Sequence, residues 1–211
     1  HLFQDGRPLI YPRAVLKMDL EPAPKIKPPH TEDHNWNQVD KTQHMHVTND
    51  ASWRTALERT AFTTFADAYG VSLKEGKRLT PGQGTRSLAT LQLTEPPTFY
   101  CRPKPTNPDE FDYRISFSDS SGEAFKWIPI TDLTLRTYVE WQQKEGGYTP
   151  GQTSYRLSKF FQGTKVFLRL GFSRPFRRTS ASEAWCYLQV NGIYTFPDYL
   201  RGKTYADLSV E

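Results

Sequence analysis

Apolar and polar residues alternate along much of the chain after residue 87. The stretch 111–118 is the clearest case, because every second residue is apolar. Its apolar members are Phe111, Tyr113, Ile115 and Phe117. Successive side chains of a β-strand point to opposite faces, so this pattern predicts a strand with one buried face. The stretch 87–93 (SLATLQL) alternates in the same way and predicts another strand.

Two further strands are predicted near the C-terminus, at 165–172 (KVFLRLGF) and 184–196 (AWCYLQVNGIYTF). The second contains Asn191-Gly192, and Asn-Gly is the dipeptide most typical of a two-residue hairpin turn. We therefore expect a hairpin at that point. The stretch 125–141 continues the apolar pattern, although Pro129 places its middle at a sheet edge or a bend, because proline cannot donate to a ladder.

A helical period is evident over 53–69, where apolar residues recur at every fourth position. They are Trp53, Leu57, Ala61, Phe65 and Tyr69. This spacing predicts an amphipathic helix, capped by Asp50 or Ser52 and ended by Gly70.

The remaining N-terminal stretches are less regular. An apolar stretch within 7–20 predicts a short strand, and four prolines between residues 22 and 29 predict an extended crossing segment. Residues 74–86 read as a glycine-rich, flexible loop. The chain is therefore expected to be mainly β with one or two helices, in a small barrel or sandwich.

Charge is distributed unevenly. The chain has 27 basic and 23 acidic residues, and the segment 146–182 contains seven basic side chains, seven aromatic ones and no acid. The rest of the chain therefore carries 20 basic and 23 acidic residues. Cations that follow phosphates, interleaved with rings that stack on bases, are typical of single-stranded nucleic-acid sites. The alternative is that the rings belong to the core and the charges are solvated.

Strand alternation refines this hypothesis. Within 165–170, Lys165, Phe167 and Arg169 share one face, and the opposite face is aliphatic. Phe167 is therefore the best predicted stacking residue. The predicted phosphate contacts are Arg156, Lys159, Lys165, Arg169, Arg174, Arg177 and Arg178. Further stacking candidates are Tyr155, Phe160, Trp127 and Phe172, and Trp127 and Trp141 are equally compatible with the core.

Four histidines form a second candidate cluster: His30, His34, His44 and His46. Neutral imidazole is a common ligand of zinc and similar ions, so a metal-dependent nuclease is one alternative function. The other interpretation is a solvated polar loop, because HExxH is absent and no cysteine lies among the histidines. No catalytic residue and no cofactor is predicted.

Other features point to structural roles. Thr131-Asp132 follows an apolar stretch and is expected to bond backbone groups and fix a turn. Cys101 and Cys186 lie far apart in sequence and are expected to be buried thiols of a cytoplasmic protein. No apolar run is long enough for a membrane helix, and no signal-peptide pattern is present.

Several passages resemble a known family. They are AVLKMDLEPAPKIKPPHTEDHNW, SLATLQLTE, FDYRISFSDSSGEAFKWIPITDL, VFLRLGFSRPF and CYLQVNGIY. Together they are similar to the dual-OB-domain proteins, a bacterial group associated with nucleic-acid binding or modification. The similarity includes the Thr131-Asp132 step and Gly171, Pro175, Phe176, Cys186 and Tyr187. The family's Glu-Asn-Trp passage is changed here, where Asp33-His34-Asn35-Trp36 occupies its place.

The resemblance implies OB-like barrels. Residues 1–86 would form a first half with helix 53–69, and residues 87–211 a second OB-like barrel. The family's opening strand would precede His1, so the first barrel is expected to be incomplete. The implied function is binding of single-stranded DNA or RNA within a bacterial defence or nucleic-acid-modification system. A scaffold subunit that docks a partner protein is the alternative from another class.

Overall fold

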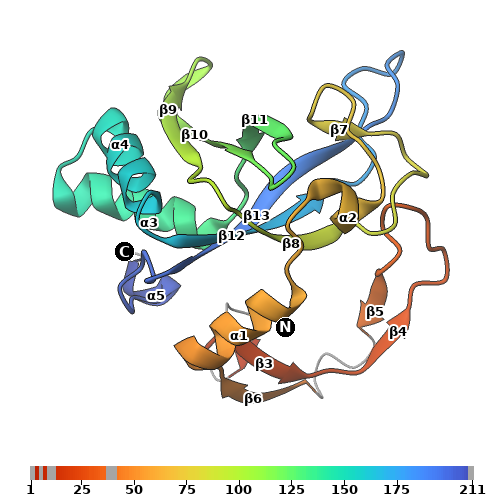
Figure 1. Ribbon diagram of the computed structural model, residues 1–211, viewed down its shortest axis with the longest axis horizontal. Helices are drawn as coiled ribbons and strands as arrows, with labels where there is room; N and C mark the ends of the chain where they lie inside the picture. Colours follow the sequence, from red (N-terminus) through yellow and green to blue (C-terminus); the bar gives the residue numbers. More distant parts are fainter. Residues whose placement is uncertain (1–2, 5–6, 9–12, 37–41, 209–211) are drawn as a thin grey trace.

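The computed structural model describes residues 3–4, 7–8, 13–36 and 42–208. Strand residues outnumber helical ones, 38% against 24%, so the prediction of a mainly β chain is confirmed. Two antiparallel sheets form the body of the molecule (Figure 1). One contains β7 (Arg78–Leu79), β13 (Cys186–Phe196), β12 (Lys165–Phe172) and β8 (Leu88–Gln92), in that order. The other contains β11 (Ala124–Pro129), β10 (Asn107–Ser118) and β9 (Thr98–Lys104).

The two sheets curl together into a half-barrel. An isolated bridge between Ile130 and Val190 connects them, and their apolar faces enclose one core. The alternating residues of 111–118 lie in β10 as predicted, with Tyr113, Ile115 and Phe117 buried. The strands predicted at 87–93 and 165–172 are also confirmed, as β8 and β12.

Rings from a short helix fill one end of this core. α2 (Phe65–Tyr69) places Phe65 5.1 Å from Phe125 and Tyr69 5.1 Å from Phe172, measured between ring centroids. Burial raises the pKa of Tyr69 far above its ordinary value, so its phenol stays neutral. The core is thus built from large rings, which bury much apolar area per residue.

The expectation of one or two helices was wrong, because the described chain contains five helical segments. They are α1 (Asp50–Thr60), α2, α3 (Leu133–Gly146), α4 (Pro150–Phe161) and α5 (Tyr205–Leu208). α3 and α4 were missed although their caps are visible in the sequence. Asp132 caps α3, and Thr149 forms a capping box with Gln152 in front of α4.

The predicted helix over 53–69 is two helices. Between them Phe62 bonds to β8 at both backbone groups, since its N–H donates to Thr90 and its carbonyl accepts from Gln92. Thr64 then caps α2, and Asp119 accepts from the Phe65 N–H. At Phe62 this pairing interrupts the helix that the four-residue period predicts, because β8 satisfies the backbone groups that would otherwise bond within the helix.

The predicted hairpin at Asn191-Gly192 was also wrong. β13 continues through both residues without a turn. Asn191 is an extra residue in the ladder, because Arg169 pairs with Gly192 and Leu170 with Val190. The Asn191 side chain donates to the Thr131 hydroxyl and crosses Gly171, where a Cβ would lie only 2.1 Å from its Oδ1. Asn-Gly therefore forms a β-bulge, which bends the strand.

Asp132 fixes this region, as expected for a structural residue. Its carboxylate accepts from the N–H of Leu135 at 3.2 Å and from the N–H of Ile193 at 2.9 Å. Burial raises its pKa, and these backbone hydrogen bonds oppose the shift. Asp132 thus connects the start of α3 to the bulged strand.

The N-terminal part forms small ribbons beside the half-barrel. Three antiparallel pairs are present: β1 (Phe3–Gln4) with β2 (Arg7–Pro8), β3 (Ala14–Lys17) with β6 (Gln43–Val47), and β4 (Leu20–Pro22) with β5 (His34–Trp36). α1 lies between the β3–β6 ribbon and the larger sheet (Figure 1). The division at residue 86 stays a prediction. None of the described helices is long and apolar enough to cross a membrane.

Candidate nucleic-acid interface

The structure places the predicted binding residues in three separate parts of the molecule. Arg156 and Lys159 lie on α4. Lys165, Phe167 and Arg169 lie on β12. Arg174, Arg177 and Arg178 lie in the loop 173–185, which we call the arginine loop. Figure 1 shows α4 and the arginine loop on opposite sides of the half-barrel, so the acid-free segment is not one continuous surface.

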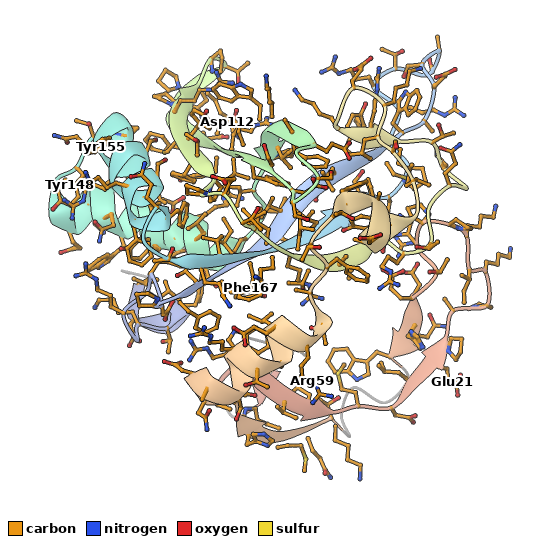
Figure 2. All side chains as sticks on the ribbon, in the orientation of Figure 1. Glu21, Arg59, Asp112, Tyr148, Tyr155 and Phe167 are labelled. Atoms are coloured by element: carbon orange, nitrogen blue, oxygen red, sulfur yellow. The ribbon has the colours of Figure 1, made fainter. Side chains whose placement is uncertain are left out.

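Phe167 is not a stacking surface, which corrects the sequence-based prediction. Its side chain is fully buried and meets Phe196 edge-on at 6.0 Å between centroids. α1 covers this face of β12, and Glu58 of that helix accepts from Lys165 at 2.7 Å. Figure 2 shows Phe167 between the sheet and α1. The alternation was read correctly, but it does not reveal that a distant helix covers the second face.

The other aromatic candidates divide into two groups. Phe172 is buried against Tyr69, and Phe160 is half-buried beside the core. Tyr155 projects from α4 with 65% of its surface exposed, and Trp127 is 38% exposed. Only the second pair is exposed enough to stack on a base.

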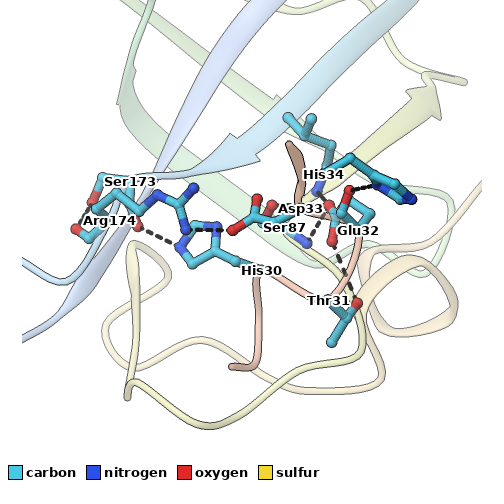
Figure 3. A network of polar contacts seen from close by, with 9 residues as sticks. His30, Thr31, Glu32, Asp33, His34, Ser87, Ser173 and Arg174 are labelled. Atoms are coloured by element: carbon cyan, nitrogen blue, oxygen red, sulfur yellow. Dashed lines mark hydrogen bonds and ion pairs between the residues drawn. The ribbon is translucent and has the colours of Figure 1, made fainter. Parts of the chain in front are cut away.

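The histidines do not form one cluster. His30 is buried, with Nε2 3.3 Å from the Ser173 carbonyl oxygen, and His34 places Nδ1 2.8 Å from the Glu32 carbonyl oxygen (Figure 3). His44 and His46 lie on β6, in another ribbon. Among the residues that the structure describes, no three His, Cys, Asp or Glu side chains are grouped to hold a metal. The geometry gives the nuclease alternative no support.

The His30 region instead holds the proline-rich segment on the half-barrel (Figure 3). Glu32 accepts from the Ser87 N–H, the Ser87 hydroxyl and the Leu88 N–H, at 2.6–2.8 Å. Burial alone would raise the pKa of Glu32, but these bonds and one from its own N–H outweigh it and lower the pKa. Arg174 is part of the same network, since its Nη1 lies 2.6 Å from Asp33 Oδ2. This predicted phosphate contact is therefore already ion-paired.

A cationic surface does exist at the arginine loop, and part of it comes from elsewhere in the sequence. We define the cationic end as Lys74, Lys77, Arg78, Arg174, Arg177 and Arg178. β7 pairs with the start of β13, and the Leu188 N–H donates to the Lys77 carbonyl at 2.9 Å. These backbone bonds bring the 74–78 segment and the arginine loop together.

Trp185 lies at the base of this surface and contacts two of its cations. Its ring is buried, with Lys74 Nζ 4.8 Å and the Arg78 guanidinium 4.6 Å from the ring centroid. Such cation–π contacts are strengthened when partly desolvated. Trp185 also pairs with Phe176 through two backbone hydrogen bonds, and these hold the arginine loop in place.

The tip of the arginine loop is the most open part. Arg177 Nη1 donates to the Ser182 carbonyl at 3.1 Å, and the Phe176 ring is 57% exposed. Within the described residues, Arg177 and Arg178 form no ion pair, although Glu183 is an acid of the same loop. Two unpaired guanidiniums beside an exposed ring are free to meet an anionic, aromatic ligand.

A second aromatic and basic site lies on the outer face of β9 and β11. The rings of Trp127 and Tyr100 stack with centroids 4.4 Å apart and an interplanar angle of 21°. The Arg102 guanidinium lies 4.8 Å from the Trp127 ring centroid. We call these three residues the Trp127 platform. Asp112 is paired with Arg114 at 2.8 Å and with Arg102 at 3.4 Å, so it holds both arginines in place.

The backbone of Trp127 is strained. Its φ is +59°, a left-handed conformation that bulky residues rarely adopt. The cause is a bulge: Phe125 and Ile128 of β11 oppose Phe117 and Ile115, so β11 carries one extra residue. Such strain costs about 1–3 kcal/mol and is concentrated at functional sites.

The cationic end and the Trp127 platform are neighbours. A Cβ on Gly76, in the 74–78 segment, would lie 3.7 Å from the Ala124 carbonyl oxygen. Trp127 follows Ala124 by three residues on β11, which corresponds to about 10 Å along a strand. The 74–78 segment of the cationic end therefore adjoins the strand that carries the platform.

Sequence reasoning missed half of this surface. Lys74, Lys77 and Arg78 were read as part of a flexible loop, although the run KEGKR was a visible signal. Tyr100 and Arg102 fall on the outward face of a strand, and no local signal distinguishes a bare face from a covered one. Comparisons with protein-family models, curated proteins and solved structures found no match for this chain. The functional inference therefore depends on the geometry of this chain.

Proposed function

We propose that this protein binds single-stranded nucleic acid along a path from the cationic end to the Trp127 platform. The observation that carries the proposal is an exposed indole, stacked on Tyr100, on a strand whose first residue, Ala124, lies beside Gly76 of the 74–78 segment. Cations contact the phosphates, and the indole supplies a flat surface for an unpaired base. A duplex would bury its bases away from Trp127, so a single strand fits this surface better.

The resemblance to the dual-OB-domain proteins also supports the proposal. An OB-like barrel binds strands across its sheet with basic and aromatic side chains, which is the kind of surface described above. We propose that the half-barrel is OB-like and that the protein acts within a bacterial defence or nucleic-acid-modification system. Of the predicted contacts, Arg177 and Arg178 remain central, while Phe167 gives way to Trp127.

The test is fluorescence anisotropy with labelled single-stranded oligonucleotides over a range of salt concentrations. The substitution Arg177→Glu/Arg178→Glu is expected to weaken binding strongly at low salt. It should also reduce the slope of log affinity against log salt by about 0.7 for each lost contact. The matched control is Lys17→Glu/Arg59→Glu, which reverses two exposed charges on β3 and α1 (Figure 2 shows Arg59).

Two results would count against the proposal. One is unchanged affinity in the arginine-loop variant at low salt. The other is a stable complex with a partner protein together with no binding of single strands, which would support the scaffold alternative.

A further inference from the structure

A small pocket lies between α3, α4 and the turn that follows β13. Its volume is about 60 Å³. Its walls include the rings of Tyr138, Phe160 and Tyr199 and the polar groups of Gln142, Arg156 and Arg201. α3 and α4 lie across the half-barrel from the arginine loop (Figure 1), so this pocket is separate from the proposed nucleic-acid path.

The charge of the pocket is positive. Two guanidiniums line it, and none of the described lining residues is acidic. In the described parts of the chain, carboxylates pair with arginines such as Arg102 and Arg174, but not with Arg156 or Arg201. Asp198, in the adjoining turn, is directed elsewhere, because it lies 4.0 Å from Arg13 and accepts from the Leu200 N–H.

One of the two arginines is held in position by its side chain before any ligand arrives, and the other lies on an ordered turn. The Arg156 guanidinium lies 4.2 Å from the centroid of the Tyr148 ring, which restricts its motion. Arg201 has a φ of +52° in a turn closed by its own N–H to the Asp198 carbonyl at 3.2 Å. A side chain fixed in advance loses less conformational entropy when it binds.

The charges of both guanidiniums act on the Tyr138 hydroxyl. Burial raises the pKa of the Tyr138 phenol, the charges of Arg201 and Arg156 lower it, and the charge of Asp198 raises it with a smaller effect. The positive potential of both arginines is therefore felt at one hydroxyl on the pocket wall.

Size and charge together specify the ligand. A water-sized atom needs about 10–15 Å³ of such space, so the pocket holds roughly four to six of them, enough for a tetrahedral oxyanion. Guanidinium matches phosphate with two parallel hydrogen bonds. We propose that this pocket binds a phosphate group between Arg156 and Arg201, either as inorganic phosphate or as a terminal phosphomonoester.

Isothermal titration calorimetry with inorganic phosphate, at constant ionic strength, tests the proposal without any nucleic acid. Wild-type protein should show saturable binding of one phosphate. The Arg156→Gln/Arg201→Gln variant should bind at least about tenfold more weakly, because charge-assisted hydrogen bonds are the strong ones. Lys17→Gln/Arg59→Gln, which removes two exposed charges on β3 and α1, is the matched control and should bind phosphate like the wild type. Far-ultraviolet circular dichroism checks that both variants are folded.

A second arm identifies the source of the phosphate. A 5′-phosphorylated oligonucleotide that binds more tightly than its 5′-hydroxyl twin, in the wild type but not in the Arg156→Gln/Arg201→Gln variant, would identify a strand end. Phosphate binding without that preference would identify the free ion. The proposal is overturned if wild-type protein gives no saturable heat with phosphate, or if the Arg156→Gln/Arg201→Gln variant binds it equally well.

Discussion

Two strands of this protein carry an aromatic ring close to cationic side chains, and the two rings lie in opposite environments. On β12, Phe167 between Lys165 and Arg169 is fully buried. On the other sheet, Trp127 beside Arg102 is exposed and stacked on Tyr100. The difference is a cover, because α1 lies over the face of Phe167 whereas Trp127 keeps 38% of its surface exposed. Exposure is therefore decided by distant segments and not by the local pattern.

The largest expected effect is on stability at the covered ring. Phe167→Ala should lower the free energy of unfolding by about 3–5 kcal/mol, because it removes a buried ring and leaves a cavity. Urea denaturation measures the loss. Affinity of the folded protein for single strands should not change, and a large loss of affinity would mean that Phe167 meets the ligand after all.

Removal of the exposed Trp127 ring should reduce single-strand binding more than it reduces stability. Trp127→Ala is expected to weaken single-strand binding by about 1–3 kcal/mol, the usual value for one base stacked on an aromatic side chain. Its unfolding free energy should change less than that of Phe167→Ala, because 38% of Trp127 is already exposed whereas Phe167 is fully buried. Anisotropy and urea denaturation on the same preparation make the comparison. Equal affinity in variant and wild type would remove Trp127 from the path.

The smallest expected effect is the pH dependence of the contact between α1 and β12. Hydrogen bonds from Lys165 and Arg54 lower the pKa of Glu58 below its ordinary 4.5. Because the pKa of Glu58 is lower in the folded state than in the unfolded state, Glu58 stabilises the fold at pH values above 4.5. That stabilisation is lost as the pH falls through the folded-state pKa. The protection factors of the β12 amides against hydrogen exchange, which compare the measured rate with the intrinsic rate at the same pH, should therefore fall in acid.

The matched control for this pH effect is Glu58→Gln, which cannot titrate. The variant should lack this part of the pH dependence. An identical acid response in variant and wild type would show that another group controls the cover.

The sequence predicted the strands well because their signal is local. Tyr113, Ile115 and Phe117 point inward simply because they alternate with polar neighbours. It failed where a remote segment decides the outcome. Phe62 leaves the helical pattern to pair with β8, and Asn191 becomes a bulge because Thr131 receives its side chain. The cationic end illustrates the same limit, since Lys74 and Arg78 meet the arginine loop only through the pairing of β7 with β13.

The packing of α4 against β9 has a consequence for self-association. Ser154 and Ser158 each accept from a backbone N–H of β9 and contact the carbonyl of the same residue, at Cys101 and Phe99. Four helical residues rise about 6 Å and two strand residues about 6.7 Å, so the two serines match the repeat of a neighbouring strand. The helix thereby imitates the strand that this edge lacks. The Phe99 and Cys101 donors of this edge are therefore already used, which disfavours the pairing of a second copy of the sheet at β9.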